Sequence, residues 1–416
     1  MILEVFYQDE TRVGRLADEP VSGRIVFQYD AEWIRRGIEL SPFHLPVAEA
    51  GLMVNTAPGF QGLPGVFHDS LPDSWGTLLL DARLRAAGLD PERVSPLVRL
   101  SYIGSRGMGA LGYRPEADSD HPGIFEAVSL AQVDRESARV LEGKTGHSKE
   151  MLALLESGGS AGGAKPKVLV AIRGDQMVIG GGVPPGHEGW LVKLSNVPSG
   201  HKDSKQEGRV EYAYSLMALA AGISMPPTRL FEIPSAKGPR GLFGVQRFDR
   251  SGSKKIHVHS LAGLLQIDFR SITCTYEDWA KAALELSGDF RQVEEIFRRL
   301  AFNIITGNCD DHAKNAAFLL DSQGEWKLSP AFDLTHSPGM NRLGTHAMSV
   351  CGSRTPGLKE LESFAGSFGV ASWREILDEV KGAARNWPRF AGDAGVRAPV
   401  AKRLGEEFAA SVNVVS

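Results

Sequence analysis

The sequence contains few cysteines, since only Cys274, Cys309 and Cys351 occur in 416 residues and no Cys-x-x-Cys pair is present. Such a sparse, odd set argues against a disulfide framework and against a zinc site built on thiolates. The sequence also lacks a long apolar run, because the longest one, around residues 215–223, is far shorter than the roughly 20 residues of a membrane span. The N-terminal residues include acids where a signal peptide would need a basic start. We therefore expect a cytoplasmic protein.

An excess of either charge is absent as well. The 46 Lys and Arg residues nearly balance the 50 Asp and Glu residues, for a net charge of −4. No general polyanion-binding field follows from this balance, although a local basic patch stays possible. The hydrophobic content of 42% and charged content of 23% are those of an ordinary globular protein. At about 150 residues per domain, the length predicts two or three domains.

The hydrophobic pattern divides the chain into a mixed beginning, a strand-rich middle and a helical end. The beginning is predicted to contain a hairpin of strands 3–7 and 13–16, a strand 24–29, and a helix from Ser74 to 87 that stops at Gly88. A polar stretch, 115–123, is interpreted as a linker. The predicted strands of the middle part are 167–172, 176–179, 189–194, 230–233 and 241–246, with one helix at 211–221. The predicted helices of the last part are 260–267, 276–286, 290–307, 373–384 and 400–412.

A glycine-rich segment, 157–167, directly precedes the predicted strand 167–172. Its four glycines let backbone amides converge on an anion, and its two lysines can add positive charge. The segment is not a P-loop, because Gly163 is followed by Ala-Lys-Pro and the segment leads into a strand instead of a helix. Its spacing alone therefore leaves two interpretations open, a phosphate-binding loop and a flexible surface loop.

A polar segment, 308–315, follows the predicted apolar helix. Asp310 and Asn315 have the Asp-x-x-x-x-Asn spacing of kinase catalytic loops, in which the Asp accepts the proton of the attacking hydroxyl and the Asn holds a metal. Lys314, between them, could neutralise charge on a transferring phosphoryl group. The His-Arg pair that precedes the Asp in protein kinases is absent, so an ordinary polar loop stays open as an alternative.

Asp333 is a lone acid among apolar residues, after a predicted strand 316–320 and a turn 321–324. An acid in such surroundings is costly unless it is paired or binds a cation. In protein kinases the second metal-binding Asp follows the catalytic loop after a similar excursion, and Asp333 follows Asp310 by 23 residues. The alternative is an Asp that caps the following turn. The three motifs, in this order, indicate a kinase more strongly than any one of them does.

These segments together resemble the HipA family of serine/threonine kinase toxins from type II toxin–antitoxin modules. Residues 310–315 resemble its Asp-x-His-x-x-Asn loop, 329–333 its Pro-x-x-Asp metal motif and 160–167 its glycine loop. Residues 246–250 resemble the Glu-Arg-Phe-Asp-Arg segment that connects the lobes and holds adenine through backbone groups, with Gln246 in place of the acid. Residues 67–73 and 103–111 resemble the first subdomain, so that the resemblance covers nearly the whole chain.

The resemblance implies an α+β, protein-kinase-like fold with two lobes. Residues 1–115 would form a HipA-type N-terminal subdomain, 124–248 a strand-rich N-lobe with the glycine loop, and 249–416 an all-helical C-lobe with the catalytic and metal motifs. The segment 257–263 replaces an acidic stretch often found after the hinge, which suggests a divergent branch of the family.

The family's site residues are transferred by position. Asp310 would be the catalytic base, His312 and Lys314 would support the reaction from the same loop, and Asn315 and Asp333 would bind Mg²⁺. ATP would contact a second set of residues, namely Ser160, Gly162, Gly163, Lys167, Lys193, Gln246 and Phe248.

Two residues carry secondary roles in this transfer. Glu211, at a predicted helix start, could buttress the site, although an acid at a helix N-terminus needs no function. Ser160 matches the serine whose autophosphorylation switches the family's kinases off, and Ser157 is the nearest rival acceptor. A phosphate on Ser160 would compete for the amides that cradle ATP and would repel the nucleotide.

The implied function is an Mg²⁺-dependent serine/threonine protein kinase that acts as a toxin. Founding members of the family phosphorylate an aminoacyl-tRNA synthetase, and the usual partner is a small helix-turn-helix antitoxin that binds operator DNA, so DNA contact would be indirect. One alternative is a metallohydrolase that uses Asp310, Asp311, His312, Asp333 and His336. Another alternative is a non-catalytic pseudokinase subunit.

Overall fold

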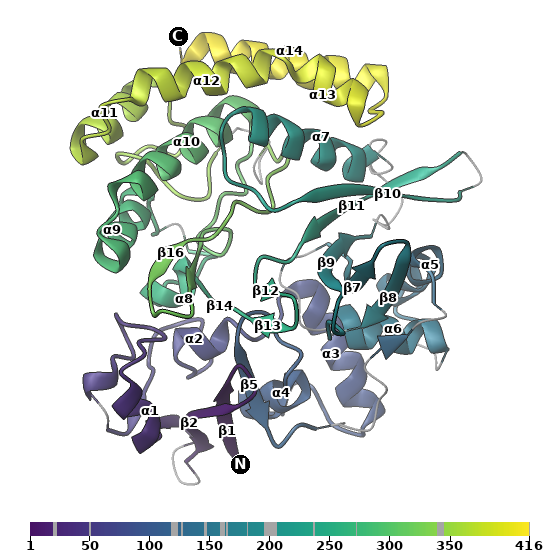
Figure 1. Ribbon diagram of the computed structural model, residues 1–416, viewed down its shortest axis with the longest axis vertical. Helices are drawn as coiled ribbons and strands as arrows, with labels where there is room; N and C mark the ends of the chain where they lie inside the picture. Colours follow the sequence, from purple (N-terminus) through teal and green to yellow (C-terminus); the bar gives the residue numbers. More distant parts are fainter. Residues whose placement is uncertain are drawn as a thin grey trace.

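The computed structural model describes residues 1–19, 23–49, 51–117, 124–125, 128–144, 148–158, 163, 165–180, 182–194, 206–235, 238–271, 273–338 and 345–415. In Figure 1 the N-terminal sheet lies at the bottom, a second sheet lies above it on the right, and the last helices lie across the top. The two chain ends therefore lie at opposite ends of the molecule, and the elements that meet between them come from all three parts of the sequence.

The N-terminal sheet has five antiparallel strands in the order β4-β3-β2-β1-β5. The strands are β1 (Ile2–Tyr7), β2 (Thr11–Asp18), β3 (Ile25–Tyr29), β4 (Met53–Val54) and β5 (Leu111–Arg114). Three residues, 8–10, join β1 to β2, and two of them, Gln8 and Asp9, have positive φ angles of 54° and 63°, which a tight hairpin turn needs. Leu3 and Val5 alternate with less buried neighbours, which gives the sheet one core-facing side. The predicted hairpin is confirmed.

The helices of the N-terminal part are α1 (Ala31–Arg36), the short 3₁₀ helix η1 (Val47–Glu49), α2 (Gly65–His68), α3 (Ser74–Ala86) and α4 (Pro96–Ile103). Helix α3 was predicted from its Pro-Asp-Ser start, whereas α1, α2 and α4 were not predicted. The core of this part is continuous with that of the C-terminal helices, since Phe27 and Phe67 belong to the same buried cluster as Trp279 and Phe302.

The second sheet has six strands in the order β10-β11-β9-β7-β8-β6, and every neighbouring pair is antiparallel. The strands are β6 (Ile124–Phe125), β7 (Lys167–Arg173), β8 (Gln176–Gly180), β9 (Glu188–Lys193), β10 (Thr228–Ile233) and β11 (Arg240–Gln246). Five of them fall within one or two residues of the predicted ranges. Strand β7 is buried on both faces from Lys167 to Ile172 and lies between the shorter strands β9 and β8, so it forms the centre of this lobe.

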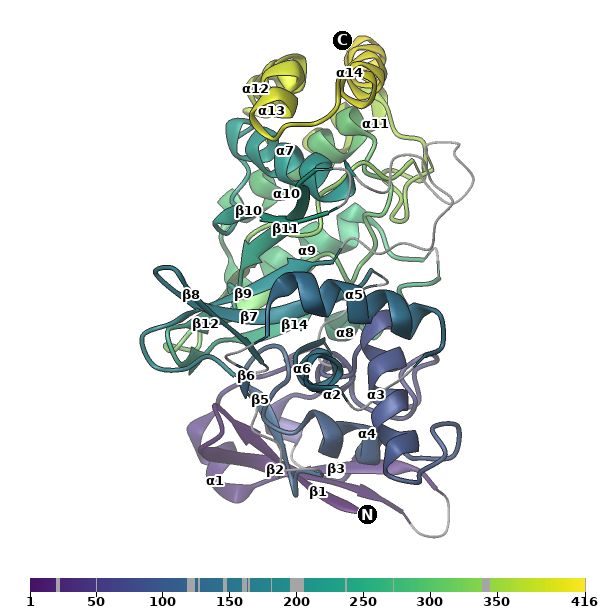
Figure 2. The same ribbon diagram turned by 90° about the vertical axis from the view of Figure 1, so that its right-hand side faces the viewer.

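The lobe built on this sheet contains more helix than the sequence predicted. Helices α5 (Leu130–Leu141) and α6 (Lys149–Gly158) pack against the sheet and α3, as Figure 2 shows, whereas the sequence predicted one helix, 211–221, among the strands. The signal for α5 was present, because Ser129 and Gln132 form a capping box at its start. The third helix, α7 (Glu207–Ala220), begins four residues before the predicted Glu211.

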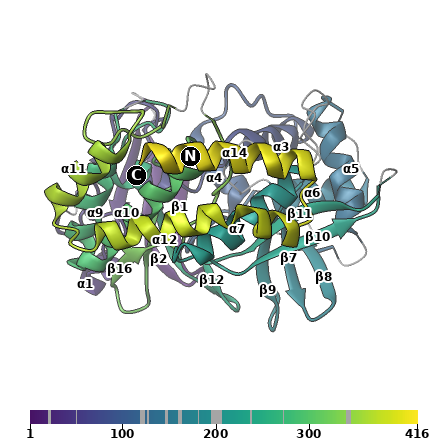
Figure 3. The same cartoon turned by 90° about the horizontal axis from the view of Figure 1, so that it is seen from above.

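The C-terminal part is mostly helical. Its helices are α8 (Leu261–Leu265), α9 (Tyr276–Ser287), α10 (Phe290–Thr306), α11 (Leu358–Phe368), α12 (Trp373–Arg385), α13 (Trp387–Asp393) and α14 (Ala398–Val414). The prediction of an all-helical lobe is wrong in one respect, because β14 (His257–Ser260), β15 (Ala317–Leu320) and β16 (Trp326–Leu328) form a three-stranded sheet beside a small hairpin of β12 (Arg250–Ser251) and β13 (Lys254–Lys255). Two strands of this sheet, β15 and β16, lie in the sequence between the candidate catalytic loop and Asp333. Seen from above in Figure 3, α12 and α14 run side by side over α7 and α10.

A buried ion cluster joins the first part of the chain to the segment after β11. Asp249 is fully buried and accepts hydrogen bonds from the guanidinium groups of Arg247 and Arg250 and from the amide of Gly109. Arg250 also donates to the Gly107 and Gly109 carbonyls. Burial would raise the pKa of Asp249, but the two guanidinium groups hold it below its usual range. We call this set of residues, 107, 109, 247, 249 and 250, the junction cluster.

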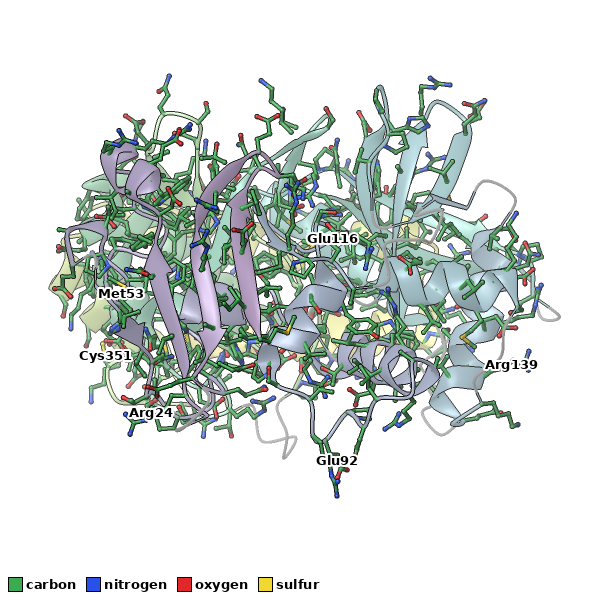
Figure 4. All side chains as sticks on the ribbon, turned by 90° about the horizontal axis from the view of Figure 1, so that it is seen from below. Arg24, Met53, Glu92, Glu116, Arg139 and Cys351 are labelled. Carbon is green, nitrogen blue, oxygen red and sulfur yellow. The ribbon has the colours of Figure 1, made fainter. Side chains whose placement is uncertain are left out.

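The face opposite the last helices is shown in Figure 4, with Arg24 and Met53 at one end, Arg139 at the other and Glu116 near the middle. Glu116 accepts a hydrogen bond from the amide of Ser105 at 2.9 Å, which fixes the chain just after β5. Among the described residues, we find no helix with both the length and the apolar content needed to cross a bilayer.

Candidate active site

The buried ammonium group of Lys193 is the centre of the candidate site. Lys193 ends β9, and its Nζ is ion-paired with Glu211 on α7 and with Asp333. Burial alone would lower the pKa of Lys193, but the carboxylates of Asp333 and Glu211 raise it above its usual range. The pKa of Asp333 is lowered by Lys193 and Lys167 against the effect of burial. Lys193 and Asp333 are therefore charged at neutral pH, and Glu211 lies beside the Lys193 ammonium group.

Asp333 has an unusual backbone. Its φ of 58° places a non-glycine residue in the left-handed region, which costs free energy that the surrounding contacts must supply. Asp333 follows the buried Ala331, which is held by a hydrogen bond from its amide to the Ser224 carbonyl at 2.7 Å. The Asp333 carboxylate contacts Lys193, so this strained residue connects the C-terminal lobe to the strand-rich lobe.

A second lysine lies beside Lys193. Lys167 opens β7 directly opposite Lys193 in the β7–β9 register, and burial lowers the pKa of its ammonium group to about 8. Gly163, just before β7, has a φ of +95°, and the Lys167 ammonium lies where a side chain at position 163 would begin. Only glycine fits this position. The predicted residues Lys167, Lys193 and Gly163 are thus brought together at one edge of the sheet.

The candidate catalytic loop, residues 308–315, begins where α10 ends. Gly307, with a φ of 67°, terminates the helix, and the following residues run to Asn315 without regular structure. The Asp310 side chain is 60% exposed, so a large acceptor can reach it. Asn315 donates from its amide nitrogen to the Asp310 carbonyl at 2.9 Å, which leaves its amide oxygen available as a ligand. His312 Nε2 lies 3.8 Å from the Asp310 carboxylate.

A small pocket lies between the candidate catalytic loop and the segment that contains Asp333. His312, Asn315, Phe332 and Asp333 are among the residues that line it. Amide and carboxylate oxygens facing one space are the donors that Mg²⁺ prefers when phosphate oxygens complete its shell. Asn315 and Asp333 therefore fit a metal that is bound together with a nucleotide.

Asp311 holds the catalytic loop from behind. Its carboxylate accepts hydrogen bonds from the Tyr276 hydroxyl and from His346 Nδ1, both at 2.7 Å, and from the Ala347 amide at 2.8 Å. Tyr276 receives a further bond from Asn303 of α10. This buried network was not predicted, because the sequence gives no sign that Tyr276 and His346, each 35 positions from Asp311, lie beside the loop. It ties the segment after Asp333 to the catalytic loop.

The charge of His346 makes this network dependent on pH. Burial would lower the pKa of His346, but its hydrogen bonds with Asp311 and Cys309 raise it from 6.5 to about 10. A raised pKa contributes stability that is complete below the unfolded value near 6.5 and is lost as pH approaches 10. We expect the free energy of unfolding, from urea titrations, to fall over this interval, and to fall less in His346→Gln. The exposed His44 provides a control, since His44→Gln should retain the wild-type slope, whereas equal slopes in all three proteins would contradict the assignment.

Lys314 was predicted to neutralise phosphoryl charge. In the structure its ammonium group lies 2.6 Å from Asp73 Oδ1, a residue of the N-terminal part, and 5.2 Å from the centre of the Phe269 ring. The same ring lies 5.0 Å from the ring of His312. The N-terminal part thus reaches the catalytic loop directly, which the sequence did not reveal.

The hinge residues lie at the end of β11. Gln246 donates its backbone amide to the Pro227 carbonyl at 2.9 Å, so any backbone contact of Gln246 with adenine would use its carbonyl oxygen. The ring of Phe248 lies 5.5 Å from that of Phe332, beside Asp333. Gln246 is therefore part of the second sheet, and Phe248 contacts the segment of Asp333.

Ser160 and Gly162 lie outside the described residues, as do residues 159, 161 and 164 of the glycine segment. Ser157, the rival acceptor, is described. It is fully buried in the last turn of α6, where its hydroxyl donates to the Ala153 carbonyl at 2.5 Å. A hydroxyl in this position is not accessible to a phosphoryl donor.

The residues of the metallohydrolase alternative are not gathered. Asp311 is engaged with Tyr276 and His346, whereas His336 bonds Glu407 of α14 at 2.8 Å. Within the described ranges, no group of three or more His, Cys, Asp or Glu side chains could hold a metal ion. This arrangement gives no support to a site with two protein-bound metals.

Comparison with known proteins settles the family. A family model described as the HipA-like C-terminal domain matches residues 159–387, more than half of the chain. The chain belongs to the HipA family. A second family model, the HipA N-terminal domain, matches residues 3–114, so both parts of the HipA arrangement are present. The resemblance predicted from the motifs is confirmed.

Curated proteins and solved structures add distant relatives of this HipA chain. It is 26% identical to "Putative kinase Y4dM" of Sinorhizobium fredii over 77% of this chain and 75% of that protein. It is 28% identical to "Putative kinase Y4mE" of the same organism, but over only 47% of this chain and 43% of that protein. A solved complex of HipA, HipB and operator DNA from Shewanella oneidensis contains a chain with a TM-score of 0.71 at 15% identity, with 99% of this chain and 96% of that chain covered. This last likeness shows the fold, and the kinase-like, two-lobed arrangement is confirmed.

Proposed function

We propose that this HipA-family chain is an Mg²⁺-dependent serine/threonine protein kinase that transfers the γ-phosphoryl group of ATP to a protein hydroxyl. The observation that carries this proposal is the Lys193 ammonium group held between Glu211 and Asp333. Protein kinases need such a Lys–Glu pair together with the metal-binding Asp before phosphoryl transfer can occur. Asp310 is exposed, and His312 and Asn315 of the same loop line a pocket together with Asp333.

The proposed roles follow from these positions. Asp310 accepts the proton of the acceptor hydroxyl as that oxygen bonds to the γ-phosphorus and the bond to the β-phosphate oxygen breaks, so that ADP leaves. Asn315 and Asp333 would hold Mg²⁺ through oxygen atoms, and the ion would supply positive charge to the phosphates. Lys193 and Lys167 would add positive charge beside Asp333.

Nucleotide binding is assigned to the edge of the second sheet. Ser160, Gly162 and Gly163 would offer backbone amides to the phosphates, and Gln246 and Phe248 would contact the adenine at the hinge. Of residues 160, 162 and 163, only Gly163 is described. Its positive φ and its closeness to the Lys167 ammonium group support this assignment.

Incubation with ATP and Mg²⁺, followed by mass spectrometry, tests both the kinase and its self-modification. We expect phosphate on Ser160 in the wild type, because Ser157 is buried and hydrogen-bonded. Asp310→Asn, treated in parallel, should carry none. Phosphate on Ser157 would contradict the described geometry of α6. Nucleotide binding without phosphate on any residue or on added protein would instead favour a pseudokinase.

The biological setting extends this proposal. We propose that the chain is the toxin of a type II toxin–antitoxin module, that it acts in the cytoplasm where ATP is present, and that its partner is a small helix-turn-helix antitoxin through which it meets DNA. The fold shared with the HipA of the Shewanella oneidensis complex and the net charge of −4 support this setting. An aminoacyl-tRNA synthetase is the proposed target. Induced expression should arrest growth in the wild type and not in Asp310→Asn.

A further inference from the structure

The first turn of α3 touches both sides of the candidate site. Asp73, the residue before this helix, places Oδ1 2.6 Å from the Lys314 ammonium group of the catalytic loop. Its other oxygen, Oδ2, accepts a hydrogen bond from the Gly163 amide at 3.3 Å, where the glycine segment enters β7. One carboxylate from the N-terminal part therefore joins the catalytic loop to the end of the glycine segment.

Trp75, in the first turn of the same helix, fixes Asp73 in this position. Its indole nitrogen donates to the Lys167 carbonyl at 3.1 Å, and its backbone amide lies 3.4 Å from the Gly163 carbonyl. Its ring and Leu79 of α3 belong to the buried core of the second sheet, together with Val168 and Val192. The start of α3 is thus packed as part of the strand-rich lobe and cannot shift without moving β7.

A second contact holds the opposite end of the glycine segment. Glu156, near the end of α6, is buried and pairs with Arg83 of α3 at 3.2 Å and with Arg106 at 3.5 Å. Both arginines come from the N-terminal part. The chain is consequently held by this part just before residue 159 and again at residue 163, on either side of the segment proposed to cover the phosphates.

We propose that Asp73 is a positioning residue for phosphoryl transfer, which holds Lys314 and the end of the glycine segment in a fixed mutual arrangement. This inference rests on the proposed kinase function. Lysine has a flexible four-carbon side chain, so its charge acts on a transferring phosphoryl group only if a neighbour fixes its place. Asp73 is that neighbour, and it also orients the amide of Gly163.

The charge of Asp73 predicts an effect that general misfolding would not produce. A carboxylate beside the phosphates repels them, so its removal should leave nucleotide binding unchanged or tighter, while the freed Lys314 no longer meets the transition state. Asp73→Asn should therefore lower the maximal rate of ADP formation at least about tenfold, and the half-saturating ATP concentration should stay constant or fall.

A matched control and a double variant separate this role from a structural one. Asp81→Asn removes a carboxylate of similar exposure on the same helix, where it pairs with Arg99 at 2.7 Å, and should leave both kinetic constants near wild type. Lys314→Met should lower the maximal rate as Asp73→Asn does, and the double variant should lose little more than either single variant. Multiplicative losses, an unchanged rate in Asp73→Asn, or a raised half-saturating ATP concentration would each overturn the proposal.

Failure of the kinase function itself would be visible in the wild type, as an absence of Asp310-dependent phosphate transfer. In that case the interaction between Asp73 and Lys314 is measured by thermal unfolding of four proteins: the wild type, Asp73→Asn, Lys314→Met and the double variant. Non-additive shifts in the unfolding midpoint would show that Asp73 and Lys314 interact without a catalytic role, which refutes the positioning proposal. Additive shifts would refute the interaction between the two residues as well.

Discussion

Asp310→Asn is expected to reduce phosphoryl transfer to any acceptor by about two to four orders of magnitude, the usual contribution of a positioned general base. Asparagine keeps the shape of the side chain and removes its capacity to accept the hydroxyl proton. Because the Asp310 side chain is 60% exposed and makes no buried ion pair, its substitution should leave the unfolding temperature near wild type. The measurement is the initial rate of ³²P incorporation from labelled ATP.

Asp378 of α12 offers a control for this substitution. Its carboxylate is exposed and makes only a loose contact with Lys381 at 3.9 Å, so Asp378→Asn changes one surface charge by the same chemistry. We expect wild-type transfer rates in this variant. A transfer rate in Asp310→Asn within threefold of that control would remove Asp310 from the mechanism.

Lys193→Met should lower phosphoryl transfer by about 100-fold or more, in line with the loss of one charge that stabilises the transition state. The substitution also leaves Glu211 and Asp333 facing each other without the cation that both contact. Two carboxylates in this position repel each other, and a buried Glu211 without its partner destabilises the fold. We therefore expect a lower unfolding temperature together with weaker binding of a fluorescent ATP analogue.

Lys193→Arg separates the two effects of this change. Arginine keeps the positive charge between Glu211 and Asp333, so the unfolding temperature should recover most of the loss. Its planar guanidinium group is larger and cannot reproduce the compact ammonium group, so phosphoryl transfer should stay low. Lys254→Met, at an exposed position on β13, controls for the loss of a lysine elsewhere. Full transfer activity in Lys193→Met would refute the kinase assignment of this trio.

The features that were predicted correctly are local in the sequence. The β1–β2 hairpin follows from alternating apolar residues around a polar turn, and the strands β7 to β9 follow from apolar runs bounded by glycine. The Asp310 to Asn315 spacing belongs to one loop, so the similarity to the family's motif could be recognised without knowledge of the fold, and the roles of the two residues stay a prediction. The position of Glu211 beside Lys193 needed the kinase resemblance, since 18 residues separate them.

The features that were missed depend on contacts between distant segments. Asp73 lies 241 residues before Lys314, and no pattern around either residue indicates that they meet. The same holds for Asp311 and His346, whose bond closes a loop of 35 residues. The short sheet of β14, β15 and β16 was missed in part for the same reason: β15 was predicted, but β14 pairs with this strand about 60 residues further on and was not predicted.

The junction cluster has a consequence for how a nucleotide could enter. Asp249 and Arg250 bind the chain after β11 to Gly107 and Gly109, while the start of α3 is packed into the core of the second sheet. The N-terminal part also shares its core with the C-terminal helices. It therefore acts as a brace across both lobes, and a wide hinge opening of the kind used by many nucleotide-binding enzymes would have to break this packing. Nucleotide should accordingly enter and leave without a wide separation of the two lobes.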